Sequence, residues 1–319
     1  MIAAIQHLME HDTAGDPISG LKWTRKTTKK ISRQLGKLGI RVGASTVARL
    51  LKQLDFALRV NTKTISHGST AERDGQFRRI TAVKHRFLAS RLPIVSVDTK
   101  KRELIGLFKN PGATWNTTPI PVNDHDFRTL ARGVGIPYGV YDPQANRGFI
   151  GVGTSHDTAA LAGDTLAAWW KSDGRRRYPT ADRLLILADC GGANGPKNAA
   201  WKYSLQTKLA NAFGLAVRVC HYPPGASKWN PIEHRLFSEV QKNWAGQPIT
   251  SYETMLNYLR TTRTEKGLRV RATLFTRHYP KGHKPSREAV AALNITPHGT
   301  LPQWNYTVLP TPRKLPRYM

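Results

Sequence analysis

Residues 183–189 constrain the fold of this chain more than any other stretch, because RLLILAD is an almost unbroken apolar run that ends in an acidic residue. A strand with one wet face is apolar at every second position, whereas a strand buried on both faces is apolar throughout. The run therefore predicts a central strand in a sheet covered by helices, which places the chain in the α/β class.

Other stretches supply strands and helices in an order that fits one mixed sheet. Residues 92–98 are rich in β-branched residues, and we expect 103–108 to be their antiparallel partner. Residues 135–142 and 148–153 form a second expected strand pair. The remaining pattern predicts helices over 77–90, 157–171, 198–213 and 231–244, and one more strand over 215–221.

The balance of charge indicates the kind of partner. The 319 residues include 49 Lys and Arg against 21 Asp and Glu, which gives a formal net charge of +28. Such an excess predicts attraction to a polyanion, most simply DNA. The basic residues are spread along the whole chain, which favours a long binding track over one basic tail.

Cysteine usage and hydropathy indicate the compartment. The two cysteines, Cys190 and Cys220, have no metal-ligand spacing, which is typical of a protein from a reducing environment. No run approaches the length of about 18 apolar residues that a membrane-spanning helix needs, and the N-terminus has no signal-peptide pattern. We expect a cytoplasmic protein.

Residues 24–60 resemble a helix–turn–helix. The first helix is expected over 28–37, Gly39 ends it, and Ser45 or Thr46 is expected to cap the second helix. The stretch 56–64 is expected to form a basic strand or wing. A second helix of this kind enters the major groove, so the expected DNA-binding residues are Lys29, Lys30, Arg33, Lys37, Ser45, Thr46 and Arg49. The alternative is a plain helical hairpin with solvated charges.

Three acidic residues stand at the ends of structural elements. Asp98 and Asp189 each end an expected buried strand, and Glu233 opens an expected helix for which Asn230 is a good N-cap. Strand ends and helix starts converge on one edge of an α/β sheet. Three adjacent carboxylates repel unless divalent cations hold them, and two such ions are the usual apparatus for attack on a phosphodiester. Glu233 is otherwise an ordinary first-turn glutamate favoured by the helix dipole.

The order of elements, which is three strands, helix, strand, helix, strand, helix, is similar to the RNase H-like fold of DDE transposases and integrases. Four motifs resemble the Rhodopirellula-type family of bacterial insertion-sequence DDE transposases: SVDTKK (96–101), LADCGGANG (187–195), PPGASKWNPIEHRLF (223–237) and WNYT (304–307). The resemblance covers roughly residues 20–310. It implies metal-dependent DNA cleavage and strand transfer at transposon ends, by a nucleoid-associated homodimer or higher oligomer.

By position, the resemblance makes Asp98, Asp189 and Glu233 the catalytic acids and the ligands of two Mg²⁺ or Mn²⁺ ions. It makes Asn194 and Asn230 candidates for contacts with the substrate or with the metal ligands. Cys190 is expected to be a small packed residue and His234 to cap the helix or contact phosphate.

The expected domains follow from these assignments. They are a remnant or linker (1–23), a small N-terminal helix–turn–helix DNA-binding domain (24–64), a linker and helix (65–90), an RNase H-like DDE catalytic domain (91–262) and a basic, Pro-rich C-terminal extension (263–319).

Two departures from the family pattern concern the ends of the chain. The chain starts later than expected, which we interpret as an N-terminal truncation, and the tail 311–319 is unfamiliar. The alternative functions are a non-catalytic DNA-binding protein derived from a transposase and an RNase H-like nuclease or resolvase.

Overall fold

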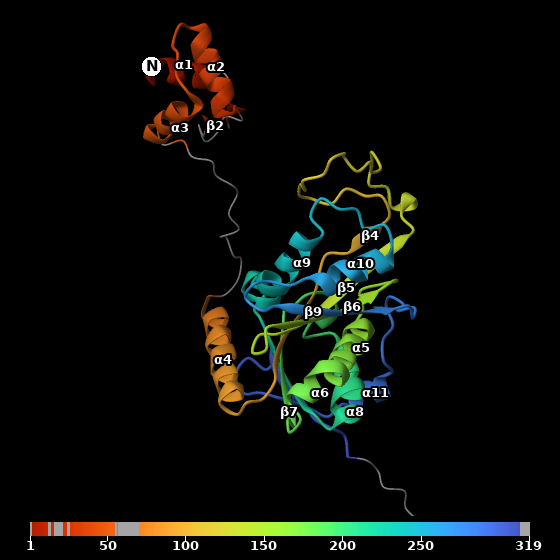
Figure 1. Ribbon diagram of the computed structural model, residues 1–319. Coiled ribbons are helices and arrows are strands. Elements are labelled where there is room, and N and C mark those ends of the chain that lie inside the picture. Colours follow the sequence, from red (N-terminus) through yellow and green to blue (C-terminus); the bar gives the residue numbers. More distant parts are fainter. Residues whose placement is uncertain are drawn as a thin grey trace, which may run out of the picture. The chain divides into compact units, whose positions relative to one another are not determined.

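The computed structural model describes residues 2–11, 14–15, 22–23, 26–54, 56 and 70–312. The chain divides into two compact units, Met1–Ile65 and Ser66–Met319 (Figure 1). The wing expected over 56–64, apart from Phe56, and the tail after residue 312 lie outside the described residues. Within the described residues, no helix combines the length and the apolar character needed to cross a membrane.

The N-terminal unit contains three helices around a small apolar core. The core consists of Ile5, Ile31, Leu35, Val47 and Leu50. The elements are α1 (Ile2–His11), β1 (Ala14–Gly15), β2 (Lys22–Trp23), α2 (Thr28–Lys37) and α3 (Ala44–Gln53), and β1 pairs with β2 in antiparallel fashion.

Two sequence-based expectations for this unit need correction. The interpretation of 1–23 as a remnant or linker is wrong for residues 2–11, because these form α1, whose Ile5 is fully buried in the core shared with α2 and α3. Helix α3 begins at Ala44 behind Gly43, so Ser45 and Thr46 lie in its first turn and do not cap it.

The second unit is built on a mixed sheet whose central strand order is β6-β5-β3-β7-β8. Strands β3, β7 and β8 are parallel, while β5 runs antiparallel to both β3 and β6. Three strands are followed by a helix, a strand, a helix, a strand and a helix, which confirms the RNase H-like fold. The strands are β3 (Ile94–Thr99), β5 (Gly133–Asp142), β6 (Arg147–Gly153), β7 (Arg183–Ala188) and β8 (Ala216–His221).

Strands from the C-terminal part of the chain widen both edges of this sheet. β9 (Arg269–Phe275) lies parallel to β6, and β11 (Asn305–Val308) lies antiparallel to β8 and also pairs with β10 (Ile295–Pro297). The prediction of a C-terminal extension over 263–319 is therefore wrong for the described part of that segment, because its strands hydrogen-bond into the central sheet.

The short strand β4 (Glu103–Ile105) pairs with β5 and not, as expected, with β3. The reason is the length of β5. Its residues Tyr138–Tyr141 pair with β3, which leaves Gly133–Gly135 to pair with β4. Within the described residues the sheet thus contains nine strands.

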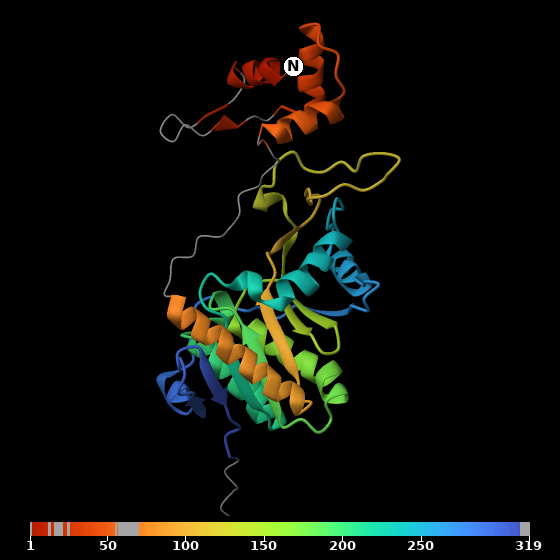
Figure 2. The same ribbon diagram turned by 90° about the vertical axis from the view of Figure 1, so that its left-hand side faces the viewer.

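Helices cover both faces of the sheet (Figures 1 and 2). On one face, α4 (Thr70–Ala89) packs on β3, β7 and β8, while α9 (Ser238–Asn243) and α10 (Tyr252–Thr261) pack over β5, β6 and β9. On the other face lie α5 (Ala159–Trp169) and α7 (Ala199–Leu205), and α11 (Arg287–Ala291) contacts α7. π-Helical turns at Trp170–Gly174 and Gln206–Ala210 continue α5 into α6 (Arg175–Arg177) and α7 into α8 (Asn211–Phe213).

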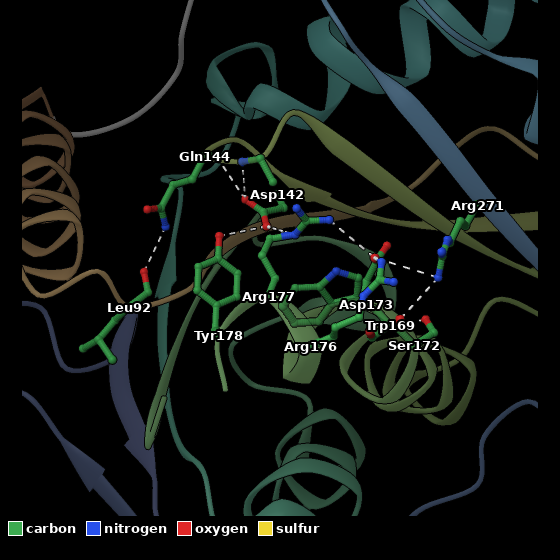
Figure 3. A network of polar contacts seen from close by, with 11 residues as sticks. Leu92, Asp142, Gln144, Trp169, Ser172, Asp173, Arg176, Arg177, Tyr178 and Arg271 are labelled. Atoms are coloured by element: carbon green, nitrogen blue, oxygen red, sulfur yellow. Dashed lines mark hydrogen bonds and ion pairs between the residues drawn. The ribbon is translucent and has the colours of Figure 1, made fainter. Parts of the chain in front are cut away.

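A network of polar contacts ties the β5–β6 turn to the α5–α6 segment (Figure 3). The buried carboxylate of Asp142 accepts hydrogen bonds from the backbone N–H of Gln144 at 3.0 Å and from the hydroxyl of Tyr178 at 2.9 Å. Arg177 lies 3.9 Å from Asp142 and 3.5 Å from Asp173. Burial raises the pKa of Asp142, and these hydrogen bonds partly offset that rise. The network fixes the end of the sheet that lies away from Asp98.

One close approach positions the helix that carries Glu233. A side chain added at Gly139 of β5 would place its Cβ 2.6 Å from the Phe237 ring and 2.8 Å from Ile232. Both of these side chains are buried. Because Gly139 pairs with Asp98 in the neighbouring strand, the absence of a side chain here lets the helix pack directly over the strand end.

We predict that Gly139→Ala destabilises the protein by about 1–3 kcal/mol, because an extra methyl group overpacks a filled core. Urea unfolding measures the effect. Gly299→Ala is the matched control, because no atom lies within 4 Å of the added methyl group there. Equal stabilities of the two variants would contradict the close-packing argument.

Candidate active site

Two of the predicted acids lie side by side at one edge of the sheet. In the parallel pairing of β3 with β7, Val97 lies opposite Ala188. Asp98 is the next residue of β3 and Asp189 directly follows β7, so both are at the carboxyl edge of the sheet. This is the edge where ligand sites form in α/β proteins.

The third acid, Glu233, begins a π-helical turn, Glu233–Phe237, that leads into α9. Asn230 is fully buried. The sequence predicted that its side chain would cap this helix, but the side chain bonds to β3. It donates to the carbonyl oxygen of Val97 at 3.2 Å and contacts the hydroxyl of Ser96. The backbone N–H of Ile232 also donates to Ser96 Oγ, at 3.2 Å. The start of the helix is thereby attached to β3 two residues before Asp98.

The carboxylates interact strongly. Asp98 is only 9% exposed, and its pKa is raised to about 8, mainly by burial and additionally by the charges of Asp189 and Glu233. The backbone N–H of Thr99 donates to Asp98 at 2.7 Å and opposes this rise.

Asp189 is held by a second asparagine. Burial, Glu233 and Asp157 raise its pKa, whereas hydrogen bonds from the Gly191 backbone and the Asn194 side chain lower it. Asn194 is itself oriented by the hydroxyl of Tyr138, which donates to Asn194 Oδ1 at 2.7 Å. One oxygen of Asp189, Oδ1, is buried and has no hydrogen-bond partner in the described part of the chain.

Within the described part of the chain, no three His, Cys, Asp or Glu side chains converge closely enough to hold a metal ion as they stand. Asp189 and Glu233 are nevertheless near enough to raise the pKa of Asp98, and Glu233 is near enough to raise the pKa of Asp189.

The sequence matches the family described as Rhodopirellula transposase DDE domain over residues 4–310. The chain belongs to this family. It is therefore a DDE transposase, and so a metal-dependent polynucleotidyl transferase that acts on DNA.

In structure, the transposase is similar to complexes of Mos1 transposase. The Mos1 paired-end complex with the left transposon end is 17% identical, with a TM-score of 0.42 over 81% of this chain and 69% of that chain. The pre-cleavage Mos1 transpososome is 15% identical, with a TM-score of 0.43 over 81% of this chain and 70% of that chain. No curated protein matches this chain.

Behind Asp189, the transposase has a buried polar network that sequence reasoning missed. His221, the last residue of β8, is fully buried, and its Nδ1 lies 2.7 Å from the backbone oxygen of Asp189. Its Nε2 lies 3.0 Å from the hydroxyl of Tyr306, which also accepts a hydrogen bond from Trp201. Burial lowers the pKa of His221 to about 4. A neutral His221 therefore fixes the backbone at Asp189. The signal in the sequence was a histidine at the end of an apolar strand, paired with the WNYT motif.

A fourth carboxylate of the transposase, Asp157, also escaped the sequence analysis. It lies just before α5, accepts a hydrogen bond from Thr99 at 3.1 Å, and raises the pKa of Asp189. Although Asp157 is exposed overall, partial burial of its carboxyl group raises the pKa of Asp157. Nothing in the local sequence marked this residue, because the loop after β6 is short and polar and reads as a simple helix start.

Two other predicted residues have structural contacts. The thiol of Cys190 donates to the backbone oxygen of Tyr222 at 3.0 Å, and burial raises its pKa to about 12, which agrees with a packed residue. The His234 ring contacts the backbone oxygen of Lys228. His234 therefore supports the loop before the helix.

A basic cavity adjoins the acids. It has a volume of about 370 Å³ and extends from Thr99 and Asp157. Its cationic lining includes Lys100, Lys101, Arg102, Arg128 and Lys281. Lys100 is turned away toward Glu103, at 2.5 Å, so the other cations remain available to an anionic ligand.

The raised pKa of Asp98 predicts a pH-dependent stability. The folded protein keeps a proton on Asp98 up to about pH 8, whereas the unfolded chain releases it near pH 4. This contribution to stability is fully present below about pH 4 and is lost as the pH rises toward 8, by at most about 1.4 kcal/mol per pH unit. Urea unfolding across this range, with a chelator present, should show a slope that Asp98→Asn reduces.

The control for this measurement is Asp182→Asn, because Asp182 is 68% exposed and pairs with Arg183 on the surface. A wild-type slope in Asp98→Asn, or an equal loss of slope in Asp182→Asn, would show that Asp98 does not carry the effect.

Proposed function

We propose that this transposase cleaves and joins DNA strands at the ends of an insertion sequence, with Asp98, Asp189 and Glu233 as ligands of two Mg²⁺ or Mn²⁺ ions. The observation that carries the proposal is the meeting of these three acids at one sheet edge. Two of them occupy matching positions on adjacent parallel strands, and the third begins a helix attached to the same strand.

The residues fit a hard divalent cation. Carboxylate oxygens are the ligands that Mg²⁺ and Mn²⁺ prefer. The buried Oδ1 of Asp189 lacks a partner, and a cation there would satisfy it. A cation beside Asp98 would also offset the repulsion by Asp189 and Glu233 that contributes to the raised pKa of Asp98.

Ions bound in this way supply an activated hydroxyl and stabilise the leaving oxygen of the phosphodiester. The protein's own contribution is position. Asn230 ties the Glu233 helix to Ser96, while Asn194 and His221 hold Asp189 by its side chain and its backbone. Neither carboxylate-bearing segment can move without breaking buried hydrogen bonds.

The basic cavity beside Asp98 is suited to the phosphates that flank the cleaved bond. Its available cations come from the segment after β3, from Arg128 and from Lys281. Cationic walls next to an acidic centre attract the DNA backbone. In this arrangement the cations bind the phosphates, and the carboxylates remain free to bind metal ions.

We further propose that the N-terminal unit binds DNA through α2 and α3. The predicted contact residues Lys29, Lys30, Arg33, Lys37, Ser45 and Arg49 are exposed, and Thr46 is half-buried. The helices therefore present cations to solvent while their apolar residues fill the core. A homodimer or higher oligomer on DNA would bring two element ends together, as end joining requires.

Glu233→Gln tests the catalytic assignment. The substitution keeps the size of the side chain but removes a charged ligand, so cleavage of terminal-repeat DNA with Mn²⁺ should fall roughly 100-fold or more. DNA binding, measured by gel shift, should persist.

The matched control is Glu239→Gln, six residues further along the helix, where the glutamate pairs with Lys242 at 2.7 Å. Cleavage by Glu239→Gln should equal that of the wild type. Undiminished cleavage by Glu233→Gln would return this residue to the role of an ordinary first-turn glutamate. A wild-type protein that binds terminal-repeat DNA but never nicks it would instead favour a non-catalytic DNA-binding protein.

Salt dependence tests the N-terminal unit. With about 6–10 phosphate contacts, DNA affinity should fall roughly 10³–10⁵-fold between about 50 and 200 mM salt. Changing Lys29, Lys30 and Arg33 together to Gln should flatten the log–log slope by about 0.9 per lost contact. Preference for terminal-repeat DNA over random duplex should also weaken, because these contacts set the position from which bases are read.

Lys242→Gln serves as the control, since its charge already pairs with Glu239. If the triple variant keeps both the wild-type slope and the wild-type preference, DNA recognition does not depend on α2.

A further inference from the structure

A group of arginines lies on the face of the sheet that α4 covers. Arg218 is in the middle of β8, and Arg79 and Arg86 lie seven residues apart on α4, which places them on one side of the helix. His298 lies beside this arginine cluster (Arg79, Arg86 and Arg218). Its Nε2 is 2.8 Å from the hydroxyl of Thr307, the residue that pairs with Arg218 across β11 and β8.

Part of the arginine cluster is unpaired. Nε and Nη2 of Arg218 and Nε of Arg79 are buried and have no hydrogen-bond partner among the described residues, whereas Nε of Arg86 donates to the backbone oxygen of Ala82 at 3.4 Å. Leaving a buried donor unpaired costs about 1–3 kcal/mol, and more when the group is charged. Well-packed apolar residues would avoid this cost, so the positions are better suited to binding a ligand than to supporting the fold.

The charges in the cluster are also uncompensated. Burial and then Arg79 and Arg86 lower the pKa of Arg218, against an opposing effect of Cys220. Burial and the three arginines lower the pKa of His298 to about 4. Within the described residues, no carboxylate is among the groups that shift either pKa.

The cluster borders a cavity at the edge of the sheet opposite the candidate active site. The cavity has a volume of about 300 Å³, and its polar lining comes from Arg86, Ser90, Arg183 and Arg218. Arg183 is the first residue of β7, whereas Asp189 follows the last one. Asp182 lies 3.3 Å from Arg183 and offsets the charge of that arginine.

The spacing along α4 indicates a polymeric ligand. Seven residues of an α-helix span about 10 Å, which is more than one phosphate group occupies. A DNA strand carries one phosphate per roughly 3.4 Å of helix axis, so about three successive phosphates match this length. We propose that the arginine cluster is a second phosphate-binding site, which holds backbone phosphates of a DNA strand outside the catalytic centre. This proposal rests on the proposed function in one respect, which is that the polymer is DNA. It does not depend on which residues bind the metal ions.

The test uses the full-length protein in a chelator, so that no cleavage occurs. Binding of a fluorescent duplex of random sequence is measured by anisotropy over a series of salt concentrations. Arg86→Gln should lower the log–log salt slope by about 0.9, and the triple change of Arg79, Arg86 and Arg218 to Gln by about 2–3. Arg287→Gln, an exposed residue on α11, should leave the slope unchanged.

Arg86 is exposed, so its substitution keeps the test valid even if the triple variant folds poorly. An unchanged slope in Arg86→Gln, or an equal change in Arg287→Gln, would overturn the proposal. Altered slopes together with a wild-type protein that never nicks terminal-repeat DNA would support the second site and refute only the proposed catalytic function.

His298 provides an independent readout, with its NMR signals assigned by their loss in His298→Gln. Phosphates bound to the arginines should offset their charge and raise the pKa of His298 from about 4 toward its usual value. The duplex should produce this rise and inorganic phosphate at the same phosphate concentration much less of it. An equal rise with inorganic phosphate would mean that the site takes a free anion, and no rise with either would show that the cluster binds no phosphate.

Discussion

The parallel pairing of β3 with β7 is the constraint on which the rest of the site depends. Val97 lies opposite Ala188, so the residues that follow leave the sheet together and both are acids. The two faces of β7 hold the register, because Leu185 and Leu187 pack beneath α4 while Leu184 and Ile186 pack on the opposite side. A slip of one residue would exchange these faces and separate the carboxylates.

Clustering partly buried carboxylates lowers the stability of the fold. Specific hydrogen bonds to the acids and to the segments that carry them offset part of this cost. Asn230 and Ser96 fasten the helix of Glu233 to β3, and Asn194, itself held by Tyr138, donates to Asp189. These contacts do not fully offset burial and charge repulsion, so the pKa of Asp98 remains raised. The free energy that positions the acids thus comes from neutral amides and hydroxyls, which do not compete with a cation for the carboxylates. Around this acidic centre the chain is strongly basic, so the same molecule attracts a polyanion and holds metal ions.

Local patterns predicted much of the fold, and they failed where pairing depended on distant strands. The strands at 135–142 and 148–153 do pair, since a short turn leaves neighbouring strands little choice. The segment 103–108 was assigned the wrong partner because the length of β5, not the local turn, decides where β4 binds. The Pro-rich C-terminal segment was not predicted to extend the sheet at both edges, with β9 beside β6 and with β11 and β10 beside β8.

The sequence by itself determined the α/β class, the strand ends that carry Asp98 and Asp189, and the helix start that carries Glu233, because apolar periodicity and element ends are local properties of the chain. Only the tertiary structure decided what surrounds them. Asn230 reaches Ser96 across 134 residues, and His221 lies beside the backbone of Asp189, 32 residues earlier. The arginine cluster joins α4 to β8 and appears in the sequence only as scattered charge. Such contacts depend on how strands and helices stack, and no spacing along the chain encodes that stacking directly.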